Sequence, residues 1–147
     1  MKKLLVVTTF LLFAIFSARA QKSEIFVTGN KAIRGYDPIA FFKESKPVKG
    51  DEKLSYNWKD ATWLFSTQQN LDDFKTSPEK YAPQYGCYCA YGTADGHKAP
   101  TQTETWTIVG DKLYFNYNNK VKQLWDKNQK ALIEKADQQW IDIKEKP

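Results

Sequence analysis

The chain is poor in the residue types that most often carry chemistry. Its 147 residues include two cysteines, Cys87 and Cys89, a single histidine, His97, and a single methionine, Met1. Because one bridge between residues two positions apart cannot organise a fold, the structure must be stabilised by an apolar core rather than by disulfides. One histidine leaves little from which to build a Ser-His-Asp triad, and no glycine-rich phosphate-binding loop is present. We therefore expect no enzymatic activity.

Long apolar runs are absent after the beginning of the sequence. Two lysines precede a predominantly apolar stretch at 4–16, which is shorter than the roughly 20 residues needed to cross a bilayer. Ala18 and Ala20 match the small residues that signal peptidase accepts. Residues 1–20 are therefore predicted to be a signal peptide cut after Ala20. The protein is predicted to be bacterial, periplasmic or secreted, and free of membrane association after cleavage.

A strong excess of one charge sign is also missing. The 22 lysines and arginines and the 17 aspartates and glutamates give a net charge of +5, which falls to +2 when residues 1–20 are removed. The remaining lysines are scattered along the chain rather than arranged in a stripe. We therefore expect no nucleic-acid partner.

Arginine occurs only once after residue 20, at Arg34. Its planar guanidinium can bind a carboxylate or a phosphate through two parallel hydrogen bonds, which a lysine cannot do. Arg34 directly precedes Gly35-Tyr36-Asp37. Arg34, Tyr36 and Asp37 are therefore candidate ligand-binding residues. A local ion pair between Arg34 and Asp37 or another acid is the alternative.

Aromatic residues, in contrast, are abundant, with five tryptophans, eight tyrosines and nine phenylalanines. Aromatic and β-branched residues alternate with polar ones at 54–58 and 61–65, on both sides of a two-residue polar link, which predicts a β-hairpin. A second hairpin is predicted at 106–109 and 113–117, around a Gly-Asp turn. A short strand is predicted at 25–27.

Helices are predicted around these hairpins. An Asp-Pro pair predicts a short helix over 37–42, and a helix over 67–76 is expected to place Leu71 and Phe74 against the first hairpin. In the C-terminal third, apolar residues recur at helical spacing, at Val121, Trp125, Leu132, Ala136 and Trp140. We expect two helices there, with a break at Gln129. The predicted fold class is α+β, with small antiparallel hairpins packed with short helices and followed by C-terminal amphipathic helices.

Several short motifs occur in a fixed order in the first half of the chain. They are Asp37-Pro38-Ile39-Ala40, Leu64-Phe65-Ser66-Thr67, Asn70, Phe74 and Pro78-Glu79-Lys80-Tyr81. In order and spacing they resemble the YHS domain, a small metal-handling module related to the TRASH-type zinc and copper knuckles. That family has Asp-Pro-Val-Cys, a hairpin ending in Tyr-Phe-Cys-Ser, a further cysteine four residues on, then Phe and Pro-x-x-Tyr. Gly-Tyr-Asp-Pro and Tyr-Cys-Ala-Tyr extend the resemblance to the exported single-domain branch. It implies one domain over 34–143, with its core motif at 37–81 after a lead-in segment at 21–33.

The sequence departs from this family at the three positions that carry metal-binding cysteines. Ala40, Ser66 and Asn70 occupy them here. Alanine has no donor atom, and neutral serine and asparagine are poor ligands for soft metals. The resemblance therefore implies the scaffold of the family without its usual metal site.

Cys87 and Cys89 are the remaining candidates for a soft-metal site. In an extended segment their side chains would share one face, whereas on a helix they would point about 200° apart. A zinc site needs three or four ligands, and His97 is the only histidine that could join the thiols. Three alternatives stay open here. They are a copper or zinc ion bound by Cys87, Cys89 and His97, a structural or redox disulfide, and buried or inert thiols.

These observations together suggest an exported, non-catalytic YHS-like domain that handles a soft metal ion. The first alternative is a metal-free module that binds a small ligand or a protein partner through exposed aromatics such as Tyr85, Tyr88 and Tyr91. The second alternative is an accessory protein for thiol–disulfide exchange.

Overall fold

A small sheet forms around the first predicted hairpin. In the computed structural model, which describes residues 23–147, β3 (Asp51–Trp58) pairs antiparallel with β4 (Ala61–Phe65). β1 (Val27–Thr28) and β2 (Lys31–Ala32) complete the sheet in the order β1-β2-β4-β3, with β2 parallel to β4. The first hairpin is thus confirmed. The predicted signal peptide lies outside the described residues.

The turn between β3 and β4 contains the two predicted polar residues. Lys59 and Asp60 have φ angles of +49° and +57°, the left-handed pair that joins two antiparallel strands without splaying them. Neither residue is glycine, so side-chain contacts must stabilise the left-handed conformation of the turn. The Lys59 ammonium lies 2.8 Å from the Glu24 carboxylate, 3.3 Å from that of Glu79, and over the ring of Trp58. These contacts hold the turn against the N-terminal segment.

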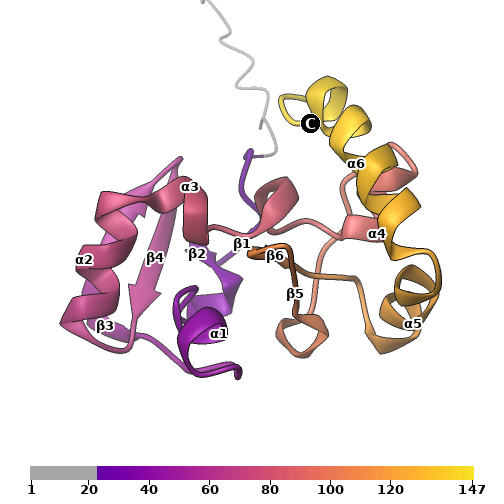
Figure 1. Cartoon of the computed structure of the whole chain (residues 1–147). Coiled ribbons are helices and arrows are strands. Elements are labelled where there is room, and N and C mark those ends of the chain that lie inside the picture. Colours follow the sequence, from indigo (N-terminus) through magenta and orange to yellow (C-terminus); the bar gives the residue numbers. More distant parts are fainter. Residues whose placement is uncertain (1–22) are drawn as a thin grey trace, which may run out of the picture.

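Three short helices accompany this sheet, and α2 packs directly on β3 and β4 (Figure 1). They are α1 (Ala40–Lys43), α2 (Gln68–Thr76) and α3 (Pro78–Tyr81). The Thr67 hydroxyl accepts a hydrogen bond from the backbone N–H of Asn70, which caps α2 where the sequence predicted its start. Leu71 and Phe74 are buried on the face of α2 that packs on the hairpin, as predicted.

The second half of the chain is mostly helical and contains one further hairpin. Its elements are η2 (Gln84–Cys87), α4 (Ala90–Ala94), η3 (Thr103–Thr105), β5 (Thr107–Val109), β6 (Lys112–Tyr114), α5 (Asn119–Lys127) and α6 (Gln129–Ile143). The predicted second hairpin is confirmed, although its last strand ends at Tyr114. The two C-terminal helices are also confirmed, with the break at Asn128 rather than Gln129. The first strand lies at 27–28 rather than 25–27.

The strand β6 separates two apolar clusters. Leu113 and Phe115 belong to the first cluster, between the sheet and α2, whereas Tyr114 belongs to the second, under α4, α5 and α6. This alternation follows from the two-residue period of an extended chain. Figure 1 shows the second hairpin between the sheet and the C-terminal helices. The fold is therefore α+β, as predicted, with two adjoining cores.

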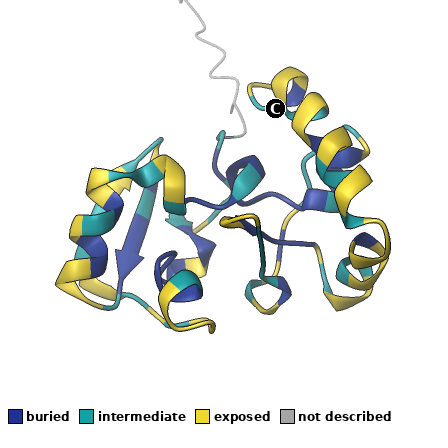
Figure 2. Ribbon diagram, in the orientation of Figure 1, coloured by how far each residue is buried: buried dark blue, intermediate teal, exposed yellow. Residues whose placement is uncertain are grey.

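The helices of the second cluster are amphipathic. Trp125 and Ala136 are fully buried, and Leu132 and Trp140 pack partly against them. In Figure 2 the outward faces of α5 and α6 are exposed and their inward faces are buried. Within residues 23–147, no helix is long and apolar enough to cross a membrane.

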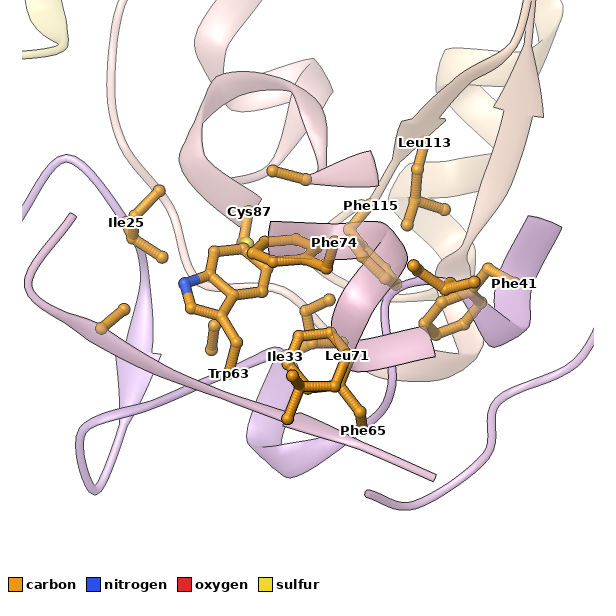
Figure 3. Close-up of a cluster of buried hydrophobic side chains, with 14 residues drawn as sticks. Ile25, Ile33, Phe41, Trp63, Phe65, Leu71, Phe74, Cys87, Leu113 and Phe115 are labelled. Atoms are coloured by element: carbon orange, nitrogen blue, oxygen red, sulfur yellow. The ribbon is translucent and has the colours of Figure 1, made fainter. Parts of the chain in front are cut away.

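The centre of the first cluster is Phe74 (Figure 3). The centroid of its ring lies 4.9 Å from that of Trp63 and 5.2 Å from that of Phe65. The side chain is fully buried. Its removal therefore leaves a cavity among large aromatic rings, which cannot collapse easily.

We expect Phe74→Ala to lower the free energy of unfolding by about 3–5 kcal/mol. Urea denaturation followed by tryptophan fluorescence measures this change. Lys75→Ala, on the exposed side of the same helix, is the matched control and should change the free energy by less than about 1 kcal/mol. Equal effects of the two substitutions would contradict the packing of α2 described above.

Candidate functional site

The first candidate site is centred on Asp37, whose carboxylate is fully buried. Its Oδ1 atom accepts a hydrogen bond from the backbone N–H of Ile39 at 2.8 Å. Its Oδ2 atom accepts three more, from the Ser66 backbone N–H at 2.8 Å, the Ser66 hydroxyl at 2.7 Å and the Asn70 amide at 2.7 Å. A buried carboxylate with four donors is well satisfied without a cation in contact with it.

Two of the three positions Ala40, Ser66 and Asn70 take part in this network. Ser66 and Asn70 both donate to Asp37, and the third position, Ala40, is fully buried and has no polar side-chain atom. The remaining oxygen of Asn70 accepts a hydrogen bond from the Lys43 ammonium at 3.1 Å. The polar atoms of these side chains are therefore used within the protein itself.

The three predicted ligand-binding residues Arg34, Tyr36 and Asp37 face different surroundings. Asp37 is committed to the network above, and Arg34 donates from Nη2 to the carbonyl oxygen of Thr101 at 3.1 Å. Tyr36 is half-buried, with the Lys49 ammonium 5.9 Å from the centre of its ring. The alternative of a local ion pair between Arg34 and Asp37 is wrong, because the carboxylate is directed to Ser66 and Asn70 instead.

Arg34 lies in one of two turns with left-handed backbone, and the second turn packs against the first. Residues 33–35 have φ angles of +49°, +53° and +85°, and residues 85–87 have φ angles of +56°, +58° and +68°. The second turn requires glycine at its centre, since a Cβ atom on Gly86 would lie 1.7 Å from the carbonyl oxygen of Glu24. The backbone N–H of Phe26 donates to the Gly86 carbonyl at 2.7 Å, which fixes this close approach. Nothing in the local sequence pattern predicts these turns.

The second turn decides where the two thiols point. Cys87 lies in its left-handed part, so the alternation that would place Cys87 and Cys89 on one face is broken. Cys87 is buried in the first cluster (Figure 3), where it lines a small cavity with Ile33 and Phe115. The segment is therefore not extended at Cys87, and the condition under which the two thiols would share one face is not met. Both cysteines are free, and no disulfide joins them.

Burial controls the chemistry of both thiols. It raises the pKa of Cys87 far above its ordinary value, an effect that a hydrogen bond from the Ile33 backbone only partly offsets. Burial also raises the pKa of Cys89, although backbone hydrogen bonds, first that of Gly92, oppose it. The Cys89 thiol lies 3.5 Å from the Asn116 side-chain oxygen, to which it donates. Protonated thiols are weak nucleophiles and weak metal ligands.

Cys89 and His97 line one pocket of about 350 Å³, together with Tyr91, Gly92, Asp95, Ala99, Tyr117 and Val121. We call it the Cys89–His97 pocket. Cys89 and Gly92 are buried at its base, and Asp95, His97 and Tyr117 are exposed at its rim. The base and walls are mainly apolar, whereas the rim offers an imidazole, a carboxylate and a phenol. Such a combination suits a small apolar group with one polar end.

The loop that carries His97 is held in place by hydrogen bonds. The backbone N–H of His97 donates to the Gly92 carbonyl at 3.1 Å, and that of Cys89 donates to the Ala99 carbonyl at 3.0 Å. The Lys98 ammonium donates to the carbonyls of Lys144, the C-cap of the last helix, and Lys146, which follows it. The rim of the pocket is thus a fixed part of the fold.

Gly92 brings the imidazole close to the base of this pocket. A Cβ atom on Gly92 would lie 3.2 Å from the Nε2 atom of His97. The sequence suggested Cys89 and His97 as partners, and the structure does place them on one pocket. The sequence did not suggest Tyr117 and Val121, which lie 20 and 24 residues beyond His97 and also line the pocket.

Of the three tyrosines that the sequence suggested for ligand binding, two are buried and one lines the pocket. Tyr85 and Tyr88 are buried, which corrects the expectation that they are exposed. The Tyr85 hydroxyl donates to Asp137 at 2.8 Å, and that of Tyr88 donates to the Ser23 carbonyl at 2.9 Å. Of the three, only Tyr91 lines the Cys89–His97 pocket.

Within residues 23–147, no group of three or more His, Cys, Asp or Glu side chains is arranged to hold a metal ion. Comparison of the chain with models of protein families, with curated proteins and with solved structures found no match.

The buried Asp37 network can be tested by placing a second carboxylate in it. Asn70→Asp should lower the free energy of unfolding by more than about 2 kcal/mol at about pH 7, because a donor to Asp37 becomes a like charge. Repulsion raises the pKa of the pair in the folded state, so part of the lost stability should return as the pH falls toward about 4. Urea titrations across this range measure the effect. A loss that does not depend on pH would contradict the contact.

The state of the thiols can be tested with Ellman's reagent. We expect no reaction of Cys87 or Cys89 in the folded protein at about pH 8, and two equivalents of reaction after denaturation without reductant. A disulfide would give no reaction in either state. Because the folded pKa values are raised, the thiols stabilise the fold below the ordinary thiol pKa of about 8.5, and this contribution is lost as the pH rises above it.

Proposed function

We propose that the protein is an exported, non-catalytic YHS-like binding module that acts without a bound metal, and that the Cys89–His97 pocket is its recognition site. The observation that carries this proposal is the pocket itself, which joins an apolar base to a polar rim on a loop fixed by hydrogen bonds. Binding requires no reactive group, and the thiol at the base is buried and protonated.

The Asp37 network supports the metal-free part of the proposal. Ser66 and Asn70 stand where the resembling family has metal ligands, and their side chains donate to a carboxylate instead. Hydrogen bonds thus join the same segments that a metal would join. A scaffold stabilised in this way is free to serve binding elsewhere on its surface.

A soft-metal role for Cys87, Cys89 and His97 has less support. Cys87 packs in the first cluster, whereas Cys89 and His97 line the pocket, so the three residues do not surround one position. Metal binding would also require two buried thiols to lose their protons. Because burial raises the pKa of both, this step makes metal binding less favourable.

The occupant that we propose is an apolar or aromatic group with a hydrogen-bonding atom at one end, and the volume of about 350 Å³ holds at least one ring. The phenol of Tyr117, the imidazole of His97 and the carboxylate of Asp95 are the groups at the rim that such an atom would meet. Phenol and indole are suitable probes, since each combines one ring system with one polar hydrogen.

NMR titration of the ¹⁵N-labelled protein with phenol or indole tests this function. We expect saturable shifts of the backbone amides of Gly92, Ala99 and Val121, with a dissociation constant on the order of 1 mM for so small a ligand. Ala99→Phe, which fills the pocket, should abolish them. Ala131→Phe, on the exposed side of α6, is the matched control and should not.

Two outcomes would contradict the proposal. One is the absence of saturable shifts at the pocket amides, and the other is binding that persists in Ala99→Phe. A parallel titration of the reduced protein with zinc or with copper(I) tests the metal alternative. Binding of one equivalent that is lost in the Cys87→Ser, Cys89→Ser double variant would favour metal handling instead.

A further inference from the structure

The Cys89–His97 pocket continues into an exposed apolar stripe. Among residues 23–147, the large apolar side chains with the greatest exposure are Tyr117 (48%), Leu124 (45%) and Ile141 (72%). Tyr117 directly precedes the N-cap of α5, and Leu124 lies on α5 itself. Val121 and Leu124 are three residues apart on α5 and share one face of the helix, and Tyr117 lies just before its N-terminal end. We call Tyr117, Val121 and Leu124 the α5 stripe.

The stripe and the pocket form one surface, because Tyr117 and Val121 belong to both. Leu124 extends this surface by one helical turn beyond the pocket. Trp125, the neighbour of Leu124, is fully buried and anchors α5 on the second cluster. The exposure of Leu124 is therefore not caused by loose packing of the helix. Because Leu124 adjoins Val121 and the pocket, it belongs to a continuous apolar patch rather than being a single scattered residue, and such patches mark interaction sites.

Lysines border the stripe. Residues 117–130 contain four lysines and one aspartate, and at about 100° per residue Lys120 and Lys127 lie on the side of Leu124 that faces solvent. Lys122 is paired with that aspartate, Asp126, at 2.7 Å. In the part of the chain that the structure describes, Lys120 and Lys127 belong to no ion pair. Their charges are available to a partner.

We propose that the α5 stripe docks an acidic segment of a partner protein, which inserts one aromatic or large aliphatic side chain into the Cys89–His97 pocket. The inference rests on the proposed function, since it names the occupant of the same pocket. Apolar contacts with Tyr117, Val121 and Leu124 supply affinity, and Lys120 and Lys127 select acidic residues beside the inserted side chain.

The shape of this surface favours a peptide over a lipid bilayer. A helix that lies in a membrane presents a long convex apolar face. The helix α5 has nine residues, and Leu124 is its one exposed large apolar side chain. The apolar surface beside it is a hollow of about 350 Å³, which accommodates a large side chain. A hollow beside a short apolar stripe matches an extended chain with one inserted side chain.

Fluorescence anisotropy tests the inference with a labelled short peptide of aspartate and glutamate that carries one central phenylalanine. We expect saturable binding that weakens as sodium chloride is raised, because exposed lysines supply part of the attraction. Leu124→Asp should weaken binding at least about tenfold, and the Lys120→Glu, Lys127→Glu double variant should do the same. Ile141→Asp changes an exposed apolar residue away from the stripe and should leave binding unchanged. The amide NMR spectrum of each variant verifies its fold.

Three results would overturn the inference. The first is no binding of the phenylalanine peptide. The second is equal binding of a peptide with glycine in place of phenylalanine, which would show charge attraction alone. The third is binding to phosphatidylcholine–phosphatidylglycerol vesicles but not to the peptide, which would assign the stripe to a membrane. If phenol still shifts the pocket amides when the peptide fails, only this inference is wrong. If both fail, the proposed function is wrong as well.

Discussion

The buried carboxylate of Asp37 is the interaction on which the first half of the structure depends. Its four hydrogen bonds reach the start of α1 through Ile39, the end of β4 through Ser66, and α2 through Asn70. A buried charge that lost these donors would be several kcal/mol less stable, so the three segments must stay together. The aromatic core around Phe74 lies among the elements that this network joins.

The second constraint is the meeting of two left-handed turns. The turns at 33–35 and 85–87 bring the chain past Glu24 so closely that only glycine fits at Gly86. This route sends Cys87 into the first cluster and leaves Cys89 at the pocket. The extended segment at β6 also separates the two clusters, because its alternate residues face one cluster or the other. Two cores in so short a chain thus follow from one strand and one pair of turns.

The proposed binding function uses the part of the molecule that these constraints leave open. The loop with His97 is fixed at both ends, and α5 is anchored by Trp125, so the pocket between them is preformed. A preformed site loses little conformational entropy when it binds. The polar network around Asp37 and the pocket lie in different parts of the fold, so stabilisation and recognition have separate side chains.

Local elements of this protein are determined by the sequence itself. The hairpin around Lys59 and Asp60, the Thr67 cap and the inward face of α2 were all predictable, since each depends on residues within a few positions of one another. Only the tertiary structure decided the direction of Cys87, the burial of Tyr85 and the meeting of His97 with Val121. A positive φ angle and a close approach between distant segments arise when the whole core is packed, and no short pattern of residues encodes them.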